Sequence, residues 1–348
     1  MKRFPLRTAL AAALLCTTVS VSAKTLVVCT EASPEGFDIV QFTTAVTADA
    51  SAETILNRLV DFAPGTTDVE PALAERWDIS PDGLEYTFHL RPDVKFHTTD
   101  YFKPTRTLNA DDVVWSFQRQ LDPNHPWHKL SLVGYPYFES MGFKDLLKSV
   151  EKVDDLTVKI TLNHPEAPFL RDVAMPFNSI YSAEYADQLL KSGKTADLNA
   201  KPIGTGPFIF VRYNKDAQVR FKANPDYFRG KPPSDALIFA IATDSNVRLQ
   251  KLKANECQIA LYPKPDEVKN IRKDPNLKVD ELAALMTSYI AMNTSHKYLS
   301  DVRVRKAIDM AFDKQTYLNS VHGEGNALLA VNPYPPTMLG YNTSIPRP

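Results

Sequence analysis

Long apolar runs, net charge and cysteine are all scarce in this chain of 348 residues. Beyond residue 23, no stretch approaches the roughly 20 apolar residues that a membrane-spanning helix needs, so we expect a soluble mature chain. The formal net charge of −1 excludes a strong global field, and no basic run suited to nucleic acid is present. A hydrophobic content of 44% is nevertheless ordinary for a globular protein, and a folded core is expected.

The first 23 residues differ from the rest of the chain. Lys2 and Arg3 give a positive start, residues 8–20 form a short apolar run, and residues 21–23 are small enough for a cleavage site. This order is typical of a secretory signal peptide. The run is too short for a membrane anchor, and the bulky residues before Cys16 suit lipoprotein processing poorly. We therefore expect an exported protein that begins near residue 24.

Only two cysteines, Cys29 and Cys257, remain in the mature chain once Cys16 leaves with the signal peptide. An even pair in an oxidising compartment favours a disulfide, and two buried free thiols are the alternative. Closing so long a loop would contribute about 4–5 kcal/mol on the chain-entropy model. A bridge would also bring the mature N-terminus next to the middle of the chain, which implies a fold that is discontinuous in sequence.

Apolar patterns predict a mixture of strands and helices. A helix is expected where apolar residues recur at helical spacing after an N-cap, and a strand where they run continuously or alternate. The predicted strands are 24–30, 85–90, 156–162, the hairpin 208–213 with 218–222, and 236–242. The predicted helices are 52–60 after Ser51, one after Asn109 with Asp111 and Asp112 in its first turn, 247–257, and one that presents Val304, Ala307, Ile308, Ala311 and Phe312 on one face. This mixture predicts α/β segments interleaved with α+β ones.

No group of residues supports catalysis. His125 and His128 are separated by Pro126, which argues against one helix that presents both to a metal. The Gly-x-Ser-x-Gly pattern of serine hydrolases is absent, and the Gly-Thr-Gly at 204–206 lacks the spacing of a phosphate-binding loop. We therefore predict a protein that is not an enzyme and uses no metal and no cofactor.

Two features favour ligand binding. Tyr135 and Tyr137 lie near Gly134 and could line a cleft, although a place in the core is the alternative. Thr43 follows the first predicted strand on a loop, and ligands prefer the edge of an open sheet from which such loops leave. Its hydroxyl can bond a ligand carboxylate or amide, or else its own backbone.

Five longer motifs follow one another along the chain. They are Leu-Ala-Glu-Arg-Trp at 73–77, Ser-Pro-Asp-Gly-Leu-Glu-Tyr-Thr-Phe-His-Leu-Arg at 80–91, Val-Lys-Phe-His at 94–97, Leu-Asn-Ala-Asp-Asp-Val at 108–113 and Pro-Ile-Gly-Thr-Gly-Pro-Phe at 202–208. Together these motifs resemble the family 5 extracellular solute-binding proteins, in particular the dipeptide-binding members. Their number and order make the resemblance specific for the family, and less so for the ligand.

The resemblance implies a type II periplasmic-binding-protein-like α/β fold, with discontinuous lobes, an inserted α+β domain and an incomplete C-terminal lobe. The implied domains are domain I at 24–60 and 200–282, inserted domain II at 61–199, and the start of a truncated domain III at 283–348. The resemblance also implies that Cys29 pairs with Cys257 and that Thr43 contacts a peptide.

The function implied is that of the substrate-binding component of an ABC-type importer, which captures dipeptides or similar small peptides in the periplasm. The expected partners are the peptide and an inner-membrane permease, with no nucleic acid, and the protein is expected to be a monomer. Binding of haem, a nickel chelate or a sugar is the alternative, because fold alone does not fix the ligand. Family members hold the peptide termini with an Asp and an Arg in a C-terminal part that follows the position of Pro348, so we expect this form to bind dipeptides weakly or to be a non-functional truncated relative.

Overall fold

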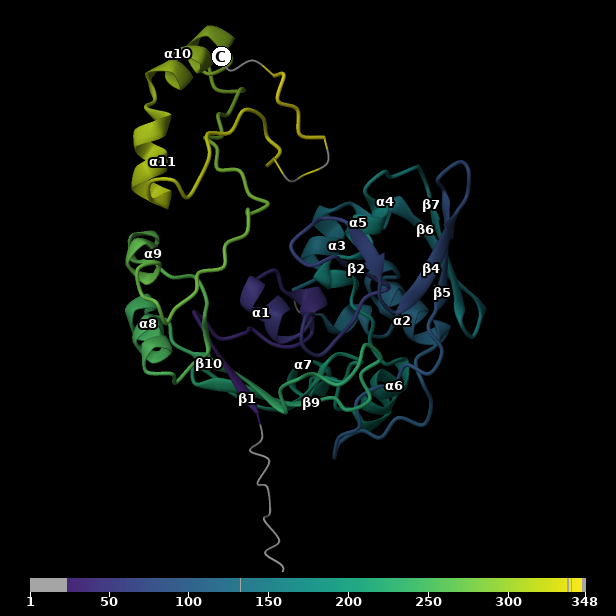
Figure 1. The fold of residues 1–348 in the computed structure, drawn as a ribbon. Helices are drawn as coiled ribbons and strands as arrows, with labels where there is room; N and C mark the ends of the chain where they lie inside the picture. Colours follow the sequence, from purple (N-terminus) through teal and green to yellow (C-terminus); the bar gives the residue numbers. More distant parts are fainter. Residues whose placement is uncertain (1–23, 132, 337, 339, 346–348) are drawn as a thin grey trace, which may run out of the picture.

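A five-stranded sheet joins the start of the chain to its middle (Figure 1). The computed structural model describes residues 24–131, 133–336, 338 and 340–345, and the predicted signal peptide at 1–23 lies outside them. The strands of this sheet are β1 (Thr25–Thr30), β8 (Phe208–Asn214), β9 (Gln218–Ala223), β10 (Ala236–Ile241) and β11 (Ile259–Ala260). Their order is β11-β1-β10-β9-β8, and this confirms the strands and the hairpin predicted for these segments.

The position of β1 explains its apolar sequence. It pairs in parallel with β10 on one side and β11 on the other, so that Cys29 lies opposite both Ala240 and Ala260. Parallel strands that are covered on both faces have nearly continuous apolar sequences, as β1 does. The three parallel strands also end at the same edge of the sheet.

A second, antiparallel sheet takes all its strands from one stretch of chain. Its order is β4-β5-β7-β6, and a separate two-stranded ribbon pairs β2 with β3. Buried side chains alternate with half-buried ones along most of β5 and all of β7, and Phe88 and Val158 are buried opposite each other. The strands are β2 (Val60–Phe62), β3 (Val69–Pro71), β4 (Ala74–Ile79), β5 (Glu85–Leu90), β6 (Leu147–Asp154) and β7 (Thr157–Leu162).

The helix α2 (Ala110–Leu121) covers this sheet by packing against β6 and β7. It begins at the predicted cap, since the Asn109 side chain accepts a hydrogen bond from the Asp111 amide at 3.0 Å. Asp112 completes the capping box by accepting from the Asn109 amide, also at 3.0 Å. Such caps contribute about 1 kcal/mol.

Short helices connect these strands, and α8 confirms the helix predicted near 247–257. The remaining elements are η1 (Ile39–Gln41), α1 (Ala45–Ala50), η2 (His128–Leu130), α3 (Pro136–Ser140), α4 (Phe143–Leu146), α5 (Phe169–Val173), η3 (Pro176–Asn178), α6 (Ala183–Ser192), α7 (Asp197–Ala200), α8 (Ser245–Lys253), α9 (Pro265–Ile271), α10 (Val302–Ala311) and α11 (Lys314–His322).

The helix predicted at 52–60 is wrong. The regular helix α1 ends at Ala50, the chain turns through residues 51–55, and Val60 begins β2. The carbonyls that a helix would use here are bonded from elsewhere: Thr54 accepts from the Phe208 amide at 3.0 Å, and Ile55 from the Gly206 amide at 2.8 Å. Hydrogen bonds to a distant segment therefore take the place of the helical bonds that the local pattern predicts. The apolar side chains of 52–60 are nevertheless buried.

The helix α10 confirms the helix predicted from Val304 to Phe312, except that Phe312 lies just beyond its end. Its apolar face is exposed, and α10 has no buried residue. In Figure 1, α10 and α11 stand apart from both sheets, connected to α9 by an extended segment. Among the described residues, no helix has the length and apolar character needed to cross a membrane.

Candidate functional site

The candidate site lies at the edge of the five-stranded sheet where β1, β10 and β11 end. In open sheets with parallel strands, ligands bind outside the carboxyl ends of those strands. The residues that follow the three strands are Glu31, Ala242 and Leu261 with Tyr262. The short helix α1 lies at this edge as well (Figure 1).

Thr43 and Tyr137 come together in the structure. Thr43 is exposed on the loop between η1 and α1, and its carbonyl accepts a hydrogen bond from the Tyr137 hydroxyl at 3.4 Å. The Tyr137 ring stacks on Phe177 with centroids 5.8 Å apart. The Thr43 hydroxyl is therefore presented at the surface by a loop that α3 supports.

Tyr135 lies elsewhere, although it is only two residues from Tyr137. Its side chain is 1% exposed, and its hydroxyl donates to the Trp127 carbonyl at 3.3 Å. Its ring faces the Arg119 guanidinium at 5.8 Å. Tyr135 thus contributes to the core of the inserted region, whereas Tyr137 lies beside Thr43.

Sequence patterns did not reveal an acidic cluster at the same edge. Glu31 follows β1, and Asp49 lies in the last turn of α1. Burial first, and then the charges of Glu53 and Glu31, raise the pKa of Asp49 to about 6. Carboxylates of this kind accept strong hydrogen bonds from an ammonium group. Glu31 could have been found from its place after β1, but nothing local in the sequence links it to Asp49.

Tyr262 is a further residue at this edge that sequence patterns did not reveal. Its side chain is 60% exposed, and burial together with Asp49 and Glu31 raises its pKa. Its φ of +50° lies in the left-handed region, which is rare for a bulky residue. Strained residues of this kind persist only where their surroundings fix them, and they concentrate at functional sites.

A hydroxyl network fixes the loop that leads to α1. The Thr47 hydroxyl accepts from the Glu35 amide at 2.9 Å, and the Thr44 hydroxyl donates to the Glu35 carboxylate at 2.8 Å. Thr43 and Thr44 are both exposed, and the bonds of this network engage the Thr44 hydroxyl. The loop is therefore held in place on both sides of Thr43.

Three of the histidines, His97, His125 and His128, have partners within the fold. His128 Nδ1 lies 3.0 Å from the Arg119 carbonyl, and His125 Nδ1 accepts from the Trp127 amide at 3.2 Å. His97 is buried, with Nε2 2.9 Å from the Gly206 carbonyl. In the part of the chain that the structure describes, no group of three or more His, Cys, Asp or Glu residues could hold a metal ion.

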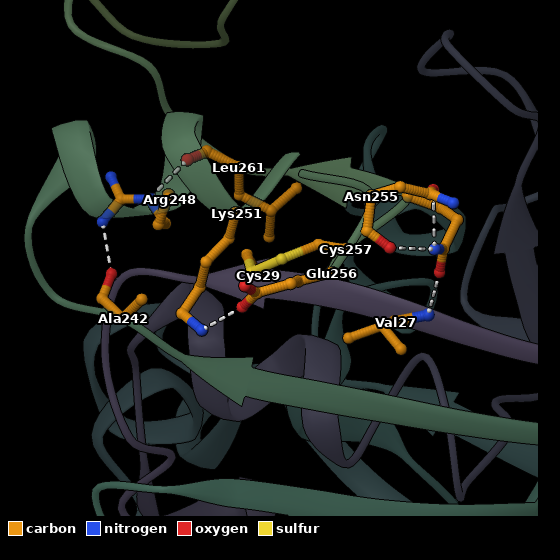
Figure 2. The surroundings of a disulfide bond; sticks show 10 residues. Val27, Cys29, Ala242, Arg248, Lys251, Asn255, Glu256, Cys257 and Leu261 are labelled. Carbon is orange, nitrogen blue, oxygen red and sulfur yellow. Dashed lines mark hydrogen bonds and ion pairs between the residues drawn. A yellow bond between two sulfur atoms is a disulfide. The ribbon is translucent and has the colours of Figure 1, made fainter. Parts of the chain in front are cut away.

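The disulfide between Cys29 and Cys257 is present, which confirms this prediction (Figure 2). It joins β1 to the turn between α8 and β11, with Cα atoms 5.8 Å apart. Both side chains are buried. The bridge therefore holds the base of the candidate site from within the sheet.

Residues 68–348 match the model of bacterial extracellular solute-binding proteins, family 5 Middle. The chain is 67% identical over 345 residues to di/tripeptide-binding protein 4 of Pseudomonas aeruginosa. The matched region covers 99% of this chain and 64% of the relative. The chain is also 48% identical over 326 residues to heme-binding protein A of Haemophilus influenzae, and this match covers 94% of the chain and 59% of the relative.

A solved structure is also similar: the periplasmic binding protein DppA of Helicobacter pylori in complex with the peptide STSA, with a TM-score of 0.85 and 40% identity, covering 92% of this chain and 62% of that one. The chain thus spans 59–64% of the length of these three proteins. The fold is of the predicted type II periplasmic-binding-protein class. The chain belongs to the bacterial extracellular solute-binding proteins of family 5.

Proposed function

We propose that this protein captures small peptides, dipeptides above all, as the substrate-binding component of an ABC-type importer. The observation that carries the proposal is the set of groups around α1: the exposed Thr43 hydroxyl before it and the Asp49 carboxyl in its last turn, with Glu31 nearby. These groups can bond a peptide amide and an ammonium. The peptide-binding relative and the peptide complex of a similar structure support the same ligand class.

The remaining parts of the proposal concern partners and compartment. We propose a periplasmic monomer, exported by the segment 1–23, that delivers its ligand to an inner-membrane permease and has no enzymatic activity. The family is described as extracellular, which agrees with an oxidised cysteine pair. Incubating the protein with a dipeptide set and analysing it by mass spectrometry tests the last point, since hydrolysis that depends on the protein would contradict it.

We also propose the division into domain I at 24–60 and 200–282, domain II at 61–199 and the start of domain III at 283–348. Strand membership supports it: one sheet combines β1 with β8–β11, and the other uses only β4–β7. Limited proteolysis followed by mass spectrometry should cut first near these boundaries. Early cleavage inside either sheet would contradict the division.

Calorimetry with a dipeptide panel tests the peptide proposal. Two proteins are compared: residues 24–348, and the same residues extended by the C-terminal third of the 67% identical relative. Thr43→Val should weaken dipeptide binding about 3–10-fold, because one hydrogen bond contributes about 0.5–1.5 kcal/mol. Thr66→Val, at an exposed position between β2 and β3, is the matched control and should not change the affinity. Absence of dipeptide binding in both proteins would refute the proposal.

Haem binding is the second candidate, because a haem-binding relative is 48% identical to the chain. Titration with haem, followed by absorbance in the Soret region, separates the two candidates. Haem would be favoured by saturable haem binding that dipeptides do not displace, together with no heat of binding when dipeptides are titrated in the calorimeter.

A further inference from the structure

Arg248, on α8, makes an unusual set of contacts. Its side chain is 4% exposed, and its guanidinium donates to four backbone carbonyls. Nη1 reaches Ala242 at 2.7 Å and Thr243 at 3.0 Å, Nε reaches Leu261 at 3.0 Å, and Nη2 reaches Tyr262 at 3.0 Å. Figure 2 shows the side chain extended between Ala242 and Leu261. Within the described residues, Arg248 forms no ion pair with a carboxylate.

The four carbonyls belong to the two segments that leave β10 and β11. These strands lie on either side of β1, and the segments emerge at the edge that carries the candidate site. Burying a charged group without a counter-charge is costly unless its donors are satisfied. The planar guanidinium can bind both segments at once because its donors form a rigid fork, which a lysine lacks.

Leu261 and Tyr262 are held from two sides. The Leu261 amide donates to the Cys29 carbonyl at 3.0 Å, and Arg248 binds the carbonyls of both residues. Tyr262 has its left-handed φ of +50° at this point. Relaxation to an ordinary φ would release strain, so the bonds from Arg248 oppose a movement that the isolated segment would favour.

The disulfide acts at the other end of β11. Cys257 precedes the strand, and next to it the Gln258 amide donates to the Val27 carbonyl at 2.9 Å while the Val27 amide donates to the Gln258 side chain at 2.9 Å. Figure 2 shows the bridge and Arg248 as separate attachments of the same segment. The bridge therefore fixes where β11 begins, and Arg248 fixes where the chain leaves it.

We propose that Arg248 is a positioning residue of the candidate site, which holds Tyr262 in its strained conformation beside Asp49 and Glu31. The part that concerns ligand binding rests on the proposed function. The part that concerns Tyr262 does not, and the two are measured separately.

Hydrogen–deuterium exchange with mass spectrometry measures the clamp without any ligand. Arg248→Lys keeps the charge but loses the fork, and should accelerate exchange in 260–263 at least tenfold while β5 is unchanged. Lys251→Ala, on the same helix at an exposed ion pair with Glu256, is the matched control and should change neither. Reduction of the disulfide should leave 260–263 protected. Uniform acceleration, or no change in 260–263, would overturn the proposal.

A double-mutant cycle separates positioning of Tyr262 from simple capping of carbonyls. Tyr262→Gly removes the strain, because glycine accepts a positive φ. In that background, Arg248→Lys should accelerate exchange in 260–263 much less than in the wild type, whereas additive effects would show that Arg248 does not act on Tyr262. Tyr262→Gly should melt at a higher temperature than Tyr262→Ala, which also lacks the ring but keeps the Cβ that makes a positive φ unfavourable. Equal melting temperatures would contradict the strain argument, and this comparison holds even if Arg248→Lys does not fold.

Calorimetry with the dipeptide Ala-Leu, on the extended protein described above, tests the consequence for binding. Arg248→Lys should weaken binding at least tenfold, and Lys251→Ala should leave it unchanged. Equal affinity of Arg248→Lys and wild type would refute the role in the site. If the wild type binds no dipeptide, the proposed function fails, while the exchange data still decide whether Arg248 positions Tyr262.

Discussion

Arg119 and Asp38 form a buried, bidentate ion pair between α2 and the loop that precedes η1. Nη1 lies 3.1 Å from Oδ1 and Nη2 lies 2.6 Å from Oδ2, and the side chains are 1% and 2% exposed. Burial alone would lower the pKa of Arg119, but Asp38 raises it above its ordinary value. Four aromatic rings face the guanidinium within 5.2–6.0 Å: Trp115, Trp127, Tyr135 and Tyr181.

Removing one partner of this pair should be far more damaging than removing both. Asp38→Asn or Arg119→Met leaves a buried charge uncompensated and should cost about 3–5 kcal/mol of unfolding free energy, whereas Asp38→Leu with Arg119→Met should cost much less than the sum. Urea denaturation measures these values. The exposed pair Arg76–Asp78 provides the control, because Arg76→Ala should cost less than about 1 kcal/mol. Additive losses in the double variant would contradict this account.

Gly206→Ala should destabilise the protein by about 3 kcal/mol, because a Cβ there would overlap the Ile55 carbonyl and the main chain would have to move. Gly193 is a suitable control. It has φ +68° at the end of α6 with nothing within 4 Å of an added Cβ, so Gly193→Ala should cost only about 1 kcal/mol of backbone strain. Thermal and urea denaturation compare the two variants, and equal costs would contradict the contact argument.

Asp49 should make the protein less stable as pH rises. Its pKa is about 6 in the folded state against 3.8 for the ordinary group, so the native state binds the proton more tightly. Its favourable contribution is complete below pH 4 and is lost as pH rises through 6, a change of about 3 kcal/mol. Asp49→Asn should therefore stabilise the protein at pH 7. Urea denaturation from pH 4.5 to 7.5 measures this, with Asp187→Asn at an exposed site as the control.

His97 should have the opposite effect in the same pH range. Burial, opposed by the bond to Gly206, lowers its pKa from 6.5 to about 4. The neutral ring therefore stabilises the fold fully above pH 6.5, and about 3 kcal/mol is lost as pH falls through 4. His97→Gln keeps a neutral donor and should reduce the loss of stability between pH 6.5 and 4.5. If the unfolding free energy of His97→Gln depended on pH in the same way as that of the wild type, His97 would not be the group responsible for the loss.

The disulfide should contribute about 5 kcal/mol, since it closes a loop between residues 228 positions apart. Cys29→Ser with Cys257→Ser should lower the unfolding free energy by about that amount in urea. Thiol counting on the denatured, unreduced mature protein should find no free thiol, and two free thiols would show that the bridge is not formed in solution.

Sequence reasoning succeeded where the determining contacts are local. The cap at Asn109 and the alternation of β5 and β7 are set by neighbouring residues, and each prediction was confirmed. It failed at 52–60, because the carbonyls of Thr54 and Ile55 are taken by a segment some 150 residues later, and helical spacing carries no information about that.

The candidate site shows the same division. The loop position of Thr43 could be predicted from the first strand alone. The opposite placements of Tyr135 and Tyr137 could not, because they depend on whether Arg119 or Thr43 is the neighbour. The proximity of Asp49 and Tyr262 depends on the parallel pairing of β1 with β11, which joins residues more than 200 positions apart.

The bridge has a consequence for the order of assembly. Cys29 and Cys257 are 228 positions apart, and all four strands of the antiparallel sheet lie between them. If the chain enters the oxidising compartment from its N-terminus, that sheet can form completely before Cys257 enters. Until then Cys29 is a lone thiol that an oxidant can trap as a mixed disulfide. The thiol chemistry that closes this fold must therefore be reversible, or must wait until the chain has appeared as far as Cys257.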